Sequence, residues 1–242
     1  MTQKSIEAYD LAQRVQSYDA DMELMHPNRA KMVDVALQVL PFATDMPIRA
    51  VDLGVGTGYL TQRFLDRFPN ATVTAIDGAR AMIDLAQIRL GESAARVKFA
   101  AGDFRELRRL AGNARNFDAA FSAYALHHLN ASDKKSVLKQ VVDLLRPEGW
   151  FINADIIKAN SLEIERRVQQ LRVAGIVKRA GGRDKRFADA MSTRKFLDDL
   201  QANEADQPLT LAEDLAILRD AGFKTAAAFW LEYRELVSGG QK

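Results

Sequence analysis

The 242-residue chain contains no cysteine and only three histidines. Without cysteine, disulfide bonds, thiolate metal sites and a cysteine nucleophile are excluded. So few histidines leave little for a metal site, and we expect no metal. No apolar run approaches the roughly 20 residues of a membrane span, and the start MTQKSIEAYD does not resemble a signal peptide. These absences favour a cytoplasmic protein with no membrane partner.

The chain also lacks a strong excess of charge of either sign. It has 34 basic and 32 acidic side chains, whereas proteins built to coat nucleic acid carry a clear basic excess. One basic run, residues 178–186, could hold a phosphate backbone, but only Phe187 follows it as a stacking surface. A solvated loop is favoured there. Nucleic acid is therefore disfavoured as a partner, with transfer RNA left open.

Apolar runs and helical patterns alternate along the middle of the chain, which predicts an α/β fold with a parallel sheet covered on both faces. We expect the remaining chain to be helical at the start, with a final helix near its end. The predicted strands are 50–53, 72–76, 97–100, 117–122 and 150–155, and the predicted helices are 61–68, 79–90, 133–145, 162–177, 187–200 and 211–221. Residues 146–149 are predicted to form a turn. The apolar stretch 223–237 is predicted to form two closing strands or, alternatively, a homodimer contact.

Three glycines at alternate positions follow the first predicted strand, in the segment Val51-Asp52-Leu53-Gly54-Val55-Gly56-Thr57-Gly58. Glycine tolerates positive φ and lets the backbone approach a ligand closely. The N–H groups at the start of the next helix favour an anionic or carboxylate-bearing small molecule. A dinucleotide-binding turn would have another glycine at Tyr59, so NAD is disfavoured.

Acidic residues follow the next two predicted strands. Asp77 lies about 20 residues beyond the glycines, where a carboxylate can accept hydrogen bonds from both hydroxyls of a ribose. The Gly102-Asp103-Phe104 segment places another carboxylate at the same sheet edge, for an adenine amine, with Phe104 or Met82 against the ring. Helix capping is the alternative explanation for both acids. The pattern predicts a nucleoside-containing ligand.

With these motifs, the chain resembles the class I S-adenosylmethionine-dependent methyltransferases over residues 48 to 157. The matching segments are VDLGVGTG, VTAIDGARAMI, AAGDF, FDAAFSAYALHHL and LLRPEGWFINAD, in family order. The resemblance implies a Rossmann-like fold with a mostly parallel seven-stranded sheet. It also implies S-adenosyl-L-methionine as cofactor and S-adenosyl-L-homocysteine as product.

The resemblance assigns cofactor roles to individual residues. It implies that the glycine turn holds the amino acid part, that Asp77 with Gly78 meets the ribose, and that Asp103 meets the adenine. Ser122 would line the floor near the sulfonium, and Asp52 would order the turn or bridge to the ammonium. Arg29 is a candidate partner for the cofactor carboxylate. The expected cofactor-binding set is Arg29, Asp52, Gly54, Gly56, Gly58, Asp77, Gly78, Met82, Gly102, Asp103, Phe104 and Ser122.

Candidate catalytic residues follow the fourth predicted strand, where an acceptor would meet the methyl group. We take His128 as the hypothetical general base, His127 as second choice, and Tyr124 as an orienting hydroxyl. The alternative is that these are structural side chains hydrogen-bonded to the backbone. Tyr9 and Tyr18 are expected to serve in ordinary helix packing.

The expected organisation is a single domain with four parts: a helical leader (1–45), a cofactor-binding core (46–157), a helical cap insertion (158–208) and a closing segment (209–242). The cap is expected to cover a small acceptor with an apolar wall. The residues expected in this wall or in the core are Leu162, Ile164, Leu171, Ile176, Phe187, Met191 and Phe196.

The sequence therefore predicts methyl transfer to an oxygen or nitrogen of a small-molecule acceptor. Two alternatives stay open. The leader, with Tyr9-Asp10 and Pro27-Asn28-Arg29, and the tail, with Ala221-Gly222-Phe223, resemble carboxy-S-adenosylmethionine synthases of transfer RNA wobble-uridine modification, in which Arg194 would reach the cofactor carboxylate. The other alternative is a non-catalytic cofactor-binding subunit.

Overall fold

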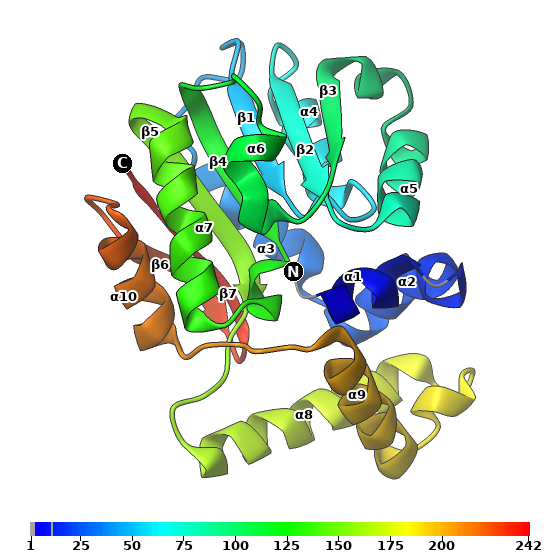
Figure 1. Cartoon of the computed structure of the whole chain (residues 1–242). Coiled ribbons are helices and arrows are strands. Elements are labelled where there is room, and N and C mark those ends of the chain that lie inside the picture. The colour runs from blue at the N-terminus through cyan, green and yellow to red at the C-terminus, as the bar shows by residue number, and fades with distance from the viewer. Residues whose placement is uncertain (1–2, 11) are drawn as a thin grey trace.

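One seven-stranded sheet forms the centre of the protein (Figure 1). The computed structural model describes residues 3–10 and 12–242, with the side chains of residues 3–5, 12–14 and 16 left out. In the described chain the strand order is β3-β2-β1-β4-β5-β7-β6, and only β7 runs antiparallel to its neighbours. The strands are β1 (Arg49–Leu53), β2 (Thr72–Asp77), β3 (Val97–Ala101), β4 (Phe117–Ala123), β5 (Leu145–Ile156), β6 (Ala227–Glu232) and β7 (Glu235–Gln241). The predicted mostly parallel seven-stranded sheet is confirmed.

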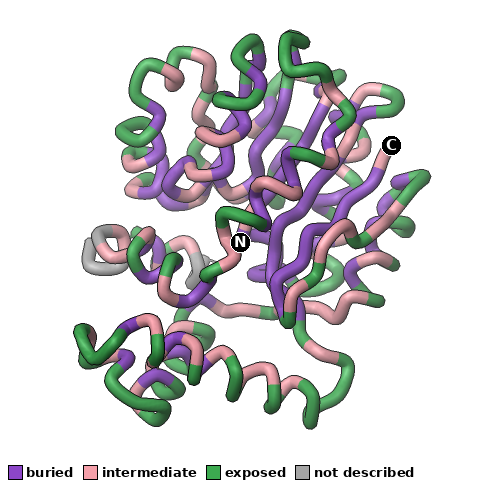
Figure 2. Tube along the Cα trace, turned by 180° about the vertical axis from the view of Figure 1, so that it is seen from behind, coloured by how far each residue is buried: buried purple, intermediate pink, exposed green. Residues whose placement is uncertain are grey.

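Helices cover both faces of this sheet. One layer contains α3 (Arg29–Val39), α4 (Tyr59–Arg67) and α5 (Arg80–Leu90), and the other contains α6 (Leu107–Leu110), α7 (Ala131–Leu144) and α10 (Leu211–Ala221). Side-chain caps fix several starts: Asn130 accepts from Asp133 N at α7, and Thr210 forms a capping box with Glu213 at α10. Figure 2 shows the strands as the buried centre between the two layers.

The leader and the cap lie together beyond the carboxyl edge of the sheet (Figure 1). The leader begins with α1 (Gln3–Asp10) and α2 (Ala12–Met25), and the cap consists of α8 (Leu162–Ala180) and α9 (Ala190–Glu204). Helix α1 contacts α9, and α2 contacts α8. A separate small core joins them: Met25, Val173, Ile176, Ala180, Phe187 and Leu197. The leader is thus held between the sheet and the cap.

The prediction of an apolar wall is wrong for three of its residues. Ile176 and Phe187 are buried in the small core, but Leu162 and Met191 are 77% and 80% exposed, and Ile164 is also exposed. For Leu162 and Ile164 the reason is that the N-terminal end of α8 extends past the leader (Figure 1). Met191 lies instead in the exposed first turn of α9. These side chains cannot line a cavity beneath the cap.

The turn predicted at residues 146–149 lies inside the bounds of β5 instead. Phe117 pairs with Leu145 and Ala119 with Trp150, so the strand carries a bulge over this segment. Glu148 adopts a φ of 62° there. At the other end of the chain, the apolar stretch forms the β6–β7 hairpin of this sheet. No described helix is long and apolar enough to cross a membrane.

Candidate active site

The turn after β1 requires glycine for steric reasons. Gly54 has a φ of 79°, and Gly58 a φ of 80°. A Cβ at Gly54 would lie 2.5 Å from the Cβ of Ala125, which is closer than packed atoms can approach. The backbone N–H groups of Gly54 and Val55 donate to Ile76 O at 2.8 and 3.0 Å. The turn is therefore fixed between the ends of β2 and β4 at the carboxyl edge of the sheet.

Asp77 ties the turn to the end of β2. Its Oδ2 accepts from Gly56 N at 2.8 Å, and its Oδ1 accepts from Ala79 N at 2.9 Å. Burial raises the pKa of Asp77 to about 6, although the two backbone N–H groups favour the charged form. The capping explanation and a place at the site thus coexist, since Asp77 also borders the cavity. Its ribose role stays a prediction.

Asp52 is a buried carboxylate with one oxygen unsatisfied. Its Oδ2 accepts from Thr61 Oγ1 at 2.5 Å, whereas its Oδ1 has no partner among the described residues. Burial raises the pKa of Asp52 to about 7, opposed by the Thr61 hydrogen bond and assisted by the nearby charge of Asp77. A free carboxylate oxygen facing the cavity fits a cationic ligand group such as an ammonium.

Asp52→Asn should gain stability relative to the wild type as pH rises. The folded pKa of about 7 lies above the unfolded value of 3.8, so the charge forms at a cost only in the folded state. Wild-type stability from this group is fully present below 3.8 and is lost as pH rises toward 7. Urea unfolding of both proteins across this window checks the prediction. A stability difference that does not change with pH would contradict it.

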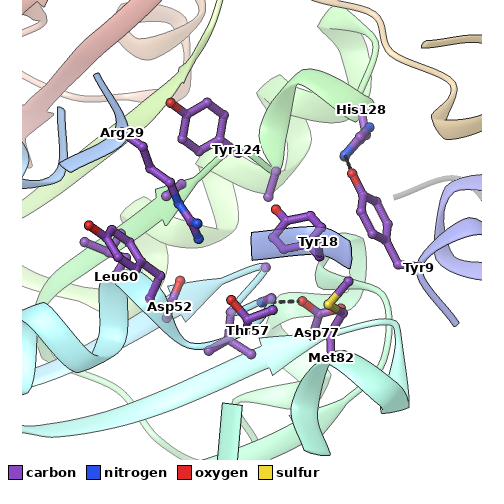
Figure 3. A pocket seen from close by; sticks show the side chains of 16 residues that line it. Tyr9, Tyr18, Arg29, Asp52, Thr57, Leu60, Asp77, Met82, Tyr124 and His128 are labelled. Carbon is purple, nitrogen blue, oxygen red and sulfur yellow. Dashed lines mark hydrogen bonds between the residues drawn. The ribbon is translucent and has the colours of Figure 1, made fainter. Parts of the chain in front are cut away.

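A small cavity opens beside the glycine turn, with a volume of about 50 Å³ (Figure 3). The leader closes it through Tyr9, Tyr18 and Arg29, so the two tyrosines are more than the helix packing predicted for them. Its wall contains Tyr9, Tyr18, Arg29, Asp52, Gly54, Val55, Gly56, Thr57, Tyr59, Leu60, Asp77, Met82, Ala123, Tyr124, Ala125 and His128. Drug-sized ligand pockets measure about 300–1,000 Å³, so entry of a nucleoside requires the leader side chains to move.

Arg29 projects into this cavity from the start of α3. Its Nη1 donates to Asp19 Oδ1 at 2.9 Å, and its guanidinium carbon lies 4.1 Å from the centre of the Tyr59 ring. Only 11% of its side chain is exposed. Arg29 is therefore no solvated surface charge, and its guanidinium is placed to meet a carboxylate.

Six of the expected cofactor residues do not line this cavity: Gly58, Gly78, Gly102, Asp103, Phe104 and Ser122. The Asp103 carboxylate accepts from Arg105 N at 2.9 Å and pairs with the Arg105 guanidinium at 2.7 Å. Burial raises its pKa, but the Arg105 contacts lower it further, to below its ordinary value. Ser122 Oγ donates to Leu53 O at 2.7 Å. Phe104 is fully buried, and Gly78 and Gly102 pack against side chains of Ile6 and Leu110. Their cofactor roles stay predictions.

The two neighbouring histidines have opposite environments. His127 Nδ1 lies 2.6 Å from Asp155 Oδ1, and Asp206 Oδ1 lies 3.5 Å from its Nε2. Burial lowers the pKa of His127, but Asp155 and Asp206 together raise it to about 10. His127 is thus protonated at neutral pH and lies outside the cavity by the glycine turn. This environment is less suited to a base than that of His128, and the role of His127 as the second candidate base stays a prediction.

His128 lines the cavity and is the histidine suited to accept a proton. Burial, followed by the positive charge of His127, lowers its pKa below the ordinary 6.5. Its Nε2 lies 3.3 Å from the Tyr9 hydroxyl, and its Nδ1 lies 3.0 Å from Asp206 Oδ1 without the angle of a regular hydrogen bond. The neutral ring is held between leader and cap.

Tyr124 has a φ of 51°, so its backbone is in the left-handed region. Its hydroxyl donates to Glu235 Oε1 at 3.0 Å. Burial, followed by the Glu235 charge, raises its pKa well above 10. Tyr124 thus stays protonated, which suits an orienting side chain and excludes a base.

His127, His128 and Asp206 are also the described cluster with the spacing of a metal site, with one candidate ligand atom from each within 4.8 Å of the others. A protonated His127 offers no lone pair to a cation. Charge contacts of the two rings with Asp206, at 3.5 Å for His127 Nε2 and 3.0 Å for His128 Nδ1, are the alternative explanation for this spacing.

Comparison with known proteins agrees with this geometry. Residues 50–149 match the family model described as a methyltransferase domain. Residues 50–149 thus resemble a methyltransferase domain, and the fold is that of the class I S-adenosylmethionine-dependent methyltransferases. Over 106 residues it is 37% identical to a malonyl-acyl-carrier-protein O-methyltransferase of Acetivibrio thermocellus, covering 44% of this chain and 35% of that protein. Thus the chain spans about a third of that relative's length.

Longer but weaker similarities extend beyond the core. A malonyl-acyl-carrier-protein O-methyltransferase of Halalkalibacterium halodurans is 27% identical over 176 residues, covering 72% of this chain and 61% of that protein. The structure of an O-methyltransferase family protein from Burkholderia thailandensis has a TM-score of 0.68 at 19% identity, covering 97% of this chain and 61% of that chain. The latter likeness concerns the fold.

Several site residues escaped prediction from the sequence. Asp206, Glu235, His26 and Arg172 surround the candidate catalytic side chains, yet they come from the leader, the cap and the last hairpin. Only Asp206 and Glu235 gave a sequence signal, as acids at the ends of elements, and nothing in the local pattern distinguished them from solvated charges.

Proposed function

We propose that this protein is an S-adenosylmethionine-dependent methyltransferase that acts on an oxygen or nitrogen of a small-molecule acceptor. The observation that carries the proposal is the single cavity that joins the glycine turn to the neutral, buried His128. The leader closes this cavity, and the cap packs on the leader, which disfavours a polymer acceptor. The family-model match ends at residue 149, before the cap, so the relatives' printed acceptor is not carried over.

The residues present fit the cofactor. The unpartnered Oδ1 of Asp52 suits its ammonium, Arg29 suits its carboxylate, and the open space beside Gly56 lets the cofactor approach the backbone. S-Adenosylmethionine supplies an electrophilic methyl group on a sulfonium centre. Closing the leader over the site excludes water and aligns the acceptor, and alignment alone lowers the barrier by several kcal/mol.

Proton transfer is the step that falls to this chain's own side chains. As the bond from the acceptor oxygen or nitrogen to the methyl carbon forms, the carbon–sulfur bond breaks and the electron pair goes to sulfur. The acceptor's proton passes to the ring nitrogen of neutral His128 that carries no proton. Tyr9 and Asp206 position the ring, and Tyr124 orients the acceptor through a hydroxyl that keeps its own proton.

Methyl-labelled S-adenosylmethionine tests the proposal directly. The purified protein is incubated with a cell extract separated into small molecules, RNA and protein, and label in the small-molecule fraction is the expected result. Tight S-adenosylhomocysteine binding by calorimetry without transfer to any fraction would identify a non-catalytic subunit. Mass spectrometry of the ligand released from the protein would identify a carboxylated cofactor, if the synthase alternative holds.

Asp77→Asn is expected to weaken S-adenosylhomocysteine binding roughly 10- to 100-fold, because hydrogen bonds to a charged group are worth about 1.5–3 kcal/mol each. Calorimetry at constant pH measures the change. Asp84→Asn, which changes an exposed acid on helix α5 just after Asp77, is the control and should bind as the wild type does. Wild-type affinity should also fall as pH drops through about 6, since protonation removes the carboxylate. An Asp77→Asn variant with unchanged affinity would remove the ribose role.

A further inference from the structure

A second, larger cavity lies on the cap side of the site. Its volume is about 320 Å³, and it lies between α8, the α2–α3 junction and the β6–β7 hairpin. Its charged and polar wall consists of His26, Asn28, Arg172, Arg179, Glu232, Arg234 and Glu235. Arg172 and His26 also line a cavity of about 40 Å³ that shares Tyr9, Tyr18 and Tyr124 with the cavity at the glycine turn. The three cavities therefore follow one another from the glycine turn to the cap.

Two arginines in this cavity, the half-buried Arg172 and the buried Arg234, each have a buried Nε atom without a partner. Arg172 comes from α8, and Arg234 comes from the tip of the β6–β7 hairpin, where it is 7% exposed. In each the Nε atom has no hydrogen-bond partner, and neither forms an ion pair within the described ranges 3–10 and 12–242. Burial, followed by the charge of Arg234, lowers the pKa of Arg172 to about 9. Burial likewise lowers the pKa of Arg234.

Two nearby carboxylates already have partners, while Asp206 and Glu235 raise the pKa of both arginines only by charge, without an ion pair, in the part of the chain that the structure describes. Glu235 Oε1 accepts from Tyr124 and contacts His26 Nδ1 at 3.0 Å. Glu165 accepts from Ala159 N and from the side-chain amide of Gln169. Burial lowers the pKa of His26 to about 4, so the imidazole is neutral and adds no charge. The positive charges of the two arginines are left without a direct counterion.

The third arginine of the wall, Arg179, differs from the other two. Its Nε donates to Leu24 O at 2.8 Å, which ties α8 to the end of α2. The opposite face of α8 carries Arg167, which is exposed. The unsatisfied pair is therefore confined to the inner side of the cavity, where the cap and the final hairpin meet.

Unpaired buried charge is costly unless a ligand supplies the missing partner. Guanidinium groups present a planar set of N–H donors that matches the oxygens of carboxylate and phosphate groups. We propose that Arg172 and Arg234 bind a carboxylate or phosphate group of the acceptor. This group would lie in the 320 Å³ cavity, at the end of the three cavities that is farthest from the glycine turn. The acceptor is then a small anionic molecule whose nucleophile points to His128. This assignment rests on the proposed function, but anion binding is measurable without turnover.

Calorimetry with inorganic phosphate and with acetate, each against equal sodium chloride, tests the site. The wild type is expected to show one saturable site, and the tighter probe distinguishes a phosphorylated from a carboxylated acceptor. Arg172→Gln and Arg234→Gln should each weaken binding at least tenfold. The matched control Arg167→Gln should bind both probes as the wild type does.

A second readout separates ligand binding from a structural role. Without anion, Arg172→Gln should melt at or above the wild-type temperature, because a buried unpaired charge is removed. If Arg172 only stabilised the fold, Arg172→Gln would melt below the wild-type temperature. Lack of saturable binding above chloride in the wild type overturns the site, as does equal weakening in Arg167→Gln. S-Adenosylhomocysteine binding in the same samples judges the proposed function separately.

Discussion

Replacing His128 by alanine is expected to lower the turnover number about 10²- to 10⁴-fold, the usual contribution of a positioned general base. His128 combines the two properties that the role needs. Its ring borders the cavity of the glycine turn, and its lowered pKa keeps the imidazole neutral at neutral pH, so one ring nitrogen is free to accept a proton. The turnover numbers of the two proteins are compared with methyl-labelled S-adenosylmethionine and the extract fraction that accepts the label from the wild type.

The pH profile distinguishes a base from a packing side chain. Wild-type turnover should be flat near neutral pH and should fall below 6.5, where His128 gains a proton. His128→Ala should lose this step and recover part of its rate with added imidazole. S-Adenosylhomocysteine affinity should stay the same in both proteins. Unchanged turnover together with an unchanged profile would eliminate the role.

Tyr9→Phe is the matched control for the contact that holds the ring. It removes the hydroxyl 3.3 Å from His128 Nε2 but keeps the aromatic ring, which packs edge-on at a centroid distance of 5.7 Å. Because Tyr9 positions the base and does not accept the proton, we expect a smaller loss than for His128→Ala, with the pH step retained.

The cofactor half of the fold was predictable because its signals are local. Glycine at 54, 56 and 58 and the acid at 77 lie within 24 residues, and each strand shows a buried run followed by a polar end. The register of the sheet then brings those ends to one edge. Parallel pairing of the strands explains why Gly56, after β1, and Asp77, at the end of β2, lie in contact.

The acceptor half was not predictable in the same way. Tyr9 meets His128 across 119 positions, and His26 meets Glu235 across 209. No periodicity links such residues, so their contacts arise only when the leader and the cap pack. The wrong expectation for Leu162 and Met191 has a similar origin, since these apolar residues lie exposed in the first turns of α8 and α9, which no local pattern reveals.

Asp103 lies at the predicted edge of the sheet, but its carboxylate contacts Arg105. It follows the third strand at the predicted edge, but Arg105 lies close enough to occupy both carboxylate oxygens. The sequence could predict where the acid would lie. The competition from a neighbouring arginine depends on the short helical turn at 104–106, which periodicity does not reveal.

The second large effect concerns stability and arises from His127. Its charged ring is the counterion of Asp155, which is 1% exposed, and of Asp206. Removing one member of a buried ion pair leaves the other charge uncompensated and typically costs about 3–5 kcal/mol. His127→Gln should therefore lower the free energy of unfolding by about that amount near pH 6, measured by urea denaturation followed by circular dichroism.

The cost should depend on pH in a direction set by the histidine. The folded pKa of about 10 lies above the unfolded value of 6.5, so the contribution is fully present below 6.5 and is lost as pH rises toward 10. The difference in the free energy of unfolding between His127→Gln and the wild type should therefore decrease as pH rises from 6.5 toward 10. The double variant His127→Gln/Asp155→Asn should regain part of the loss, because it also removes the buried carboxylate. A gap that is the same at both ends of the window, or a double variant weaker than the single one, would show that His127 stabilises by packing and not by charge.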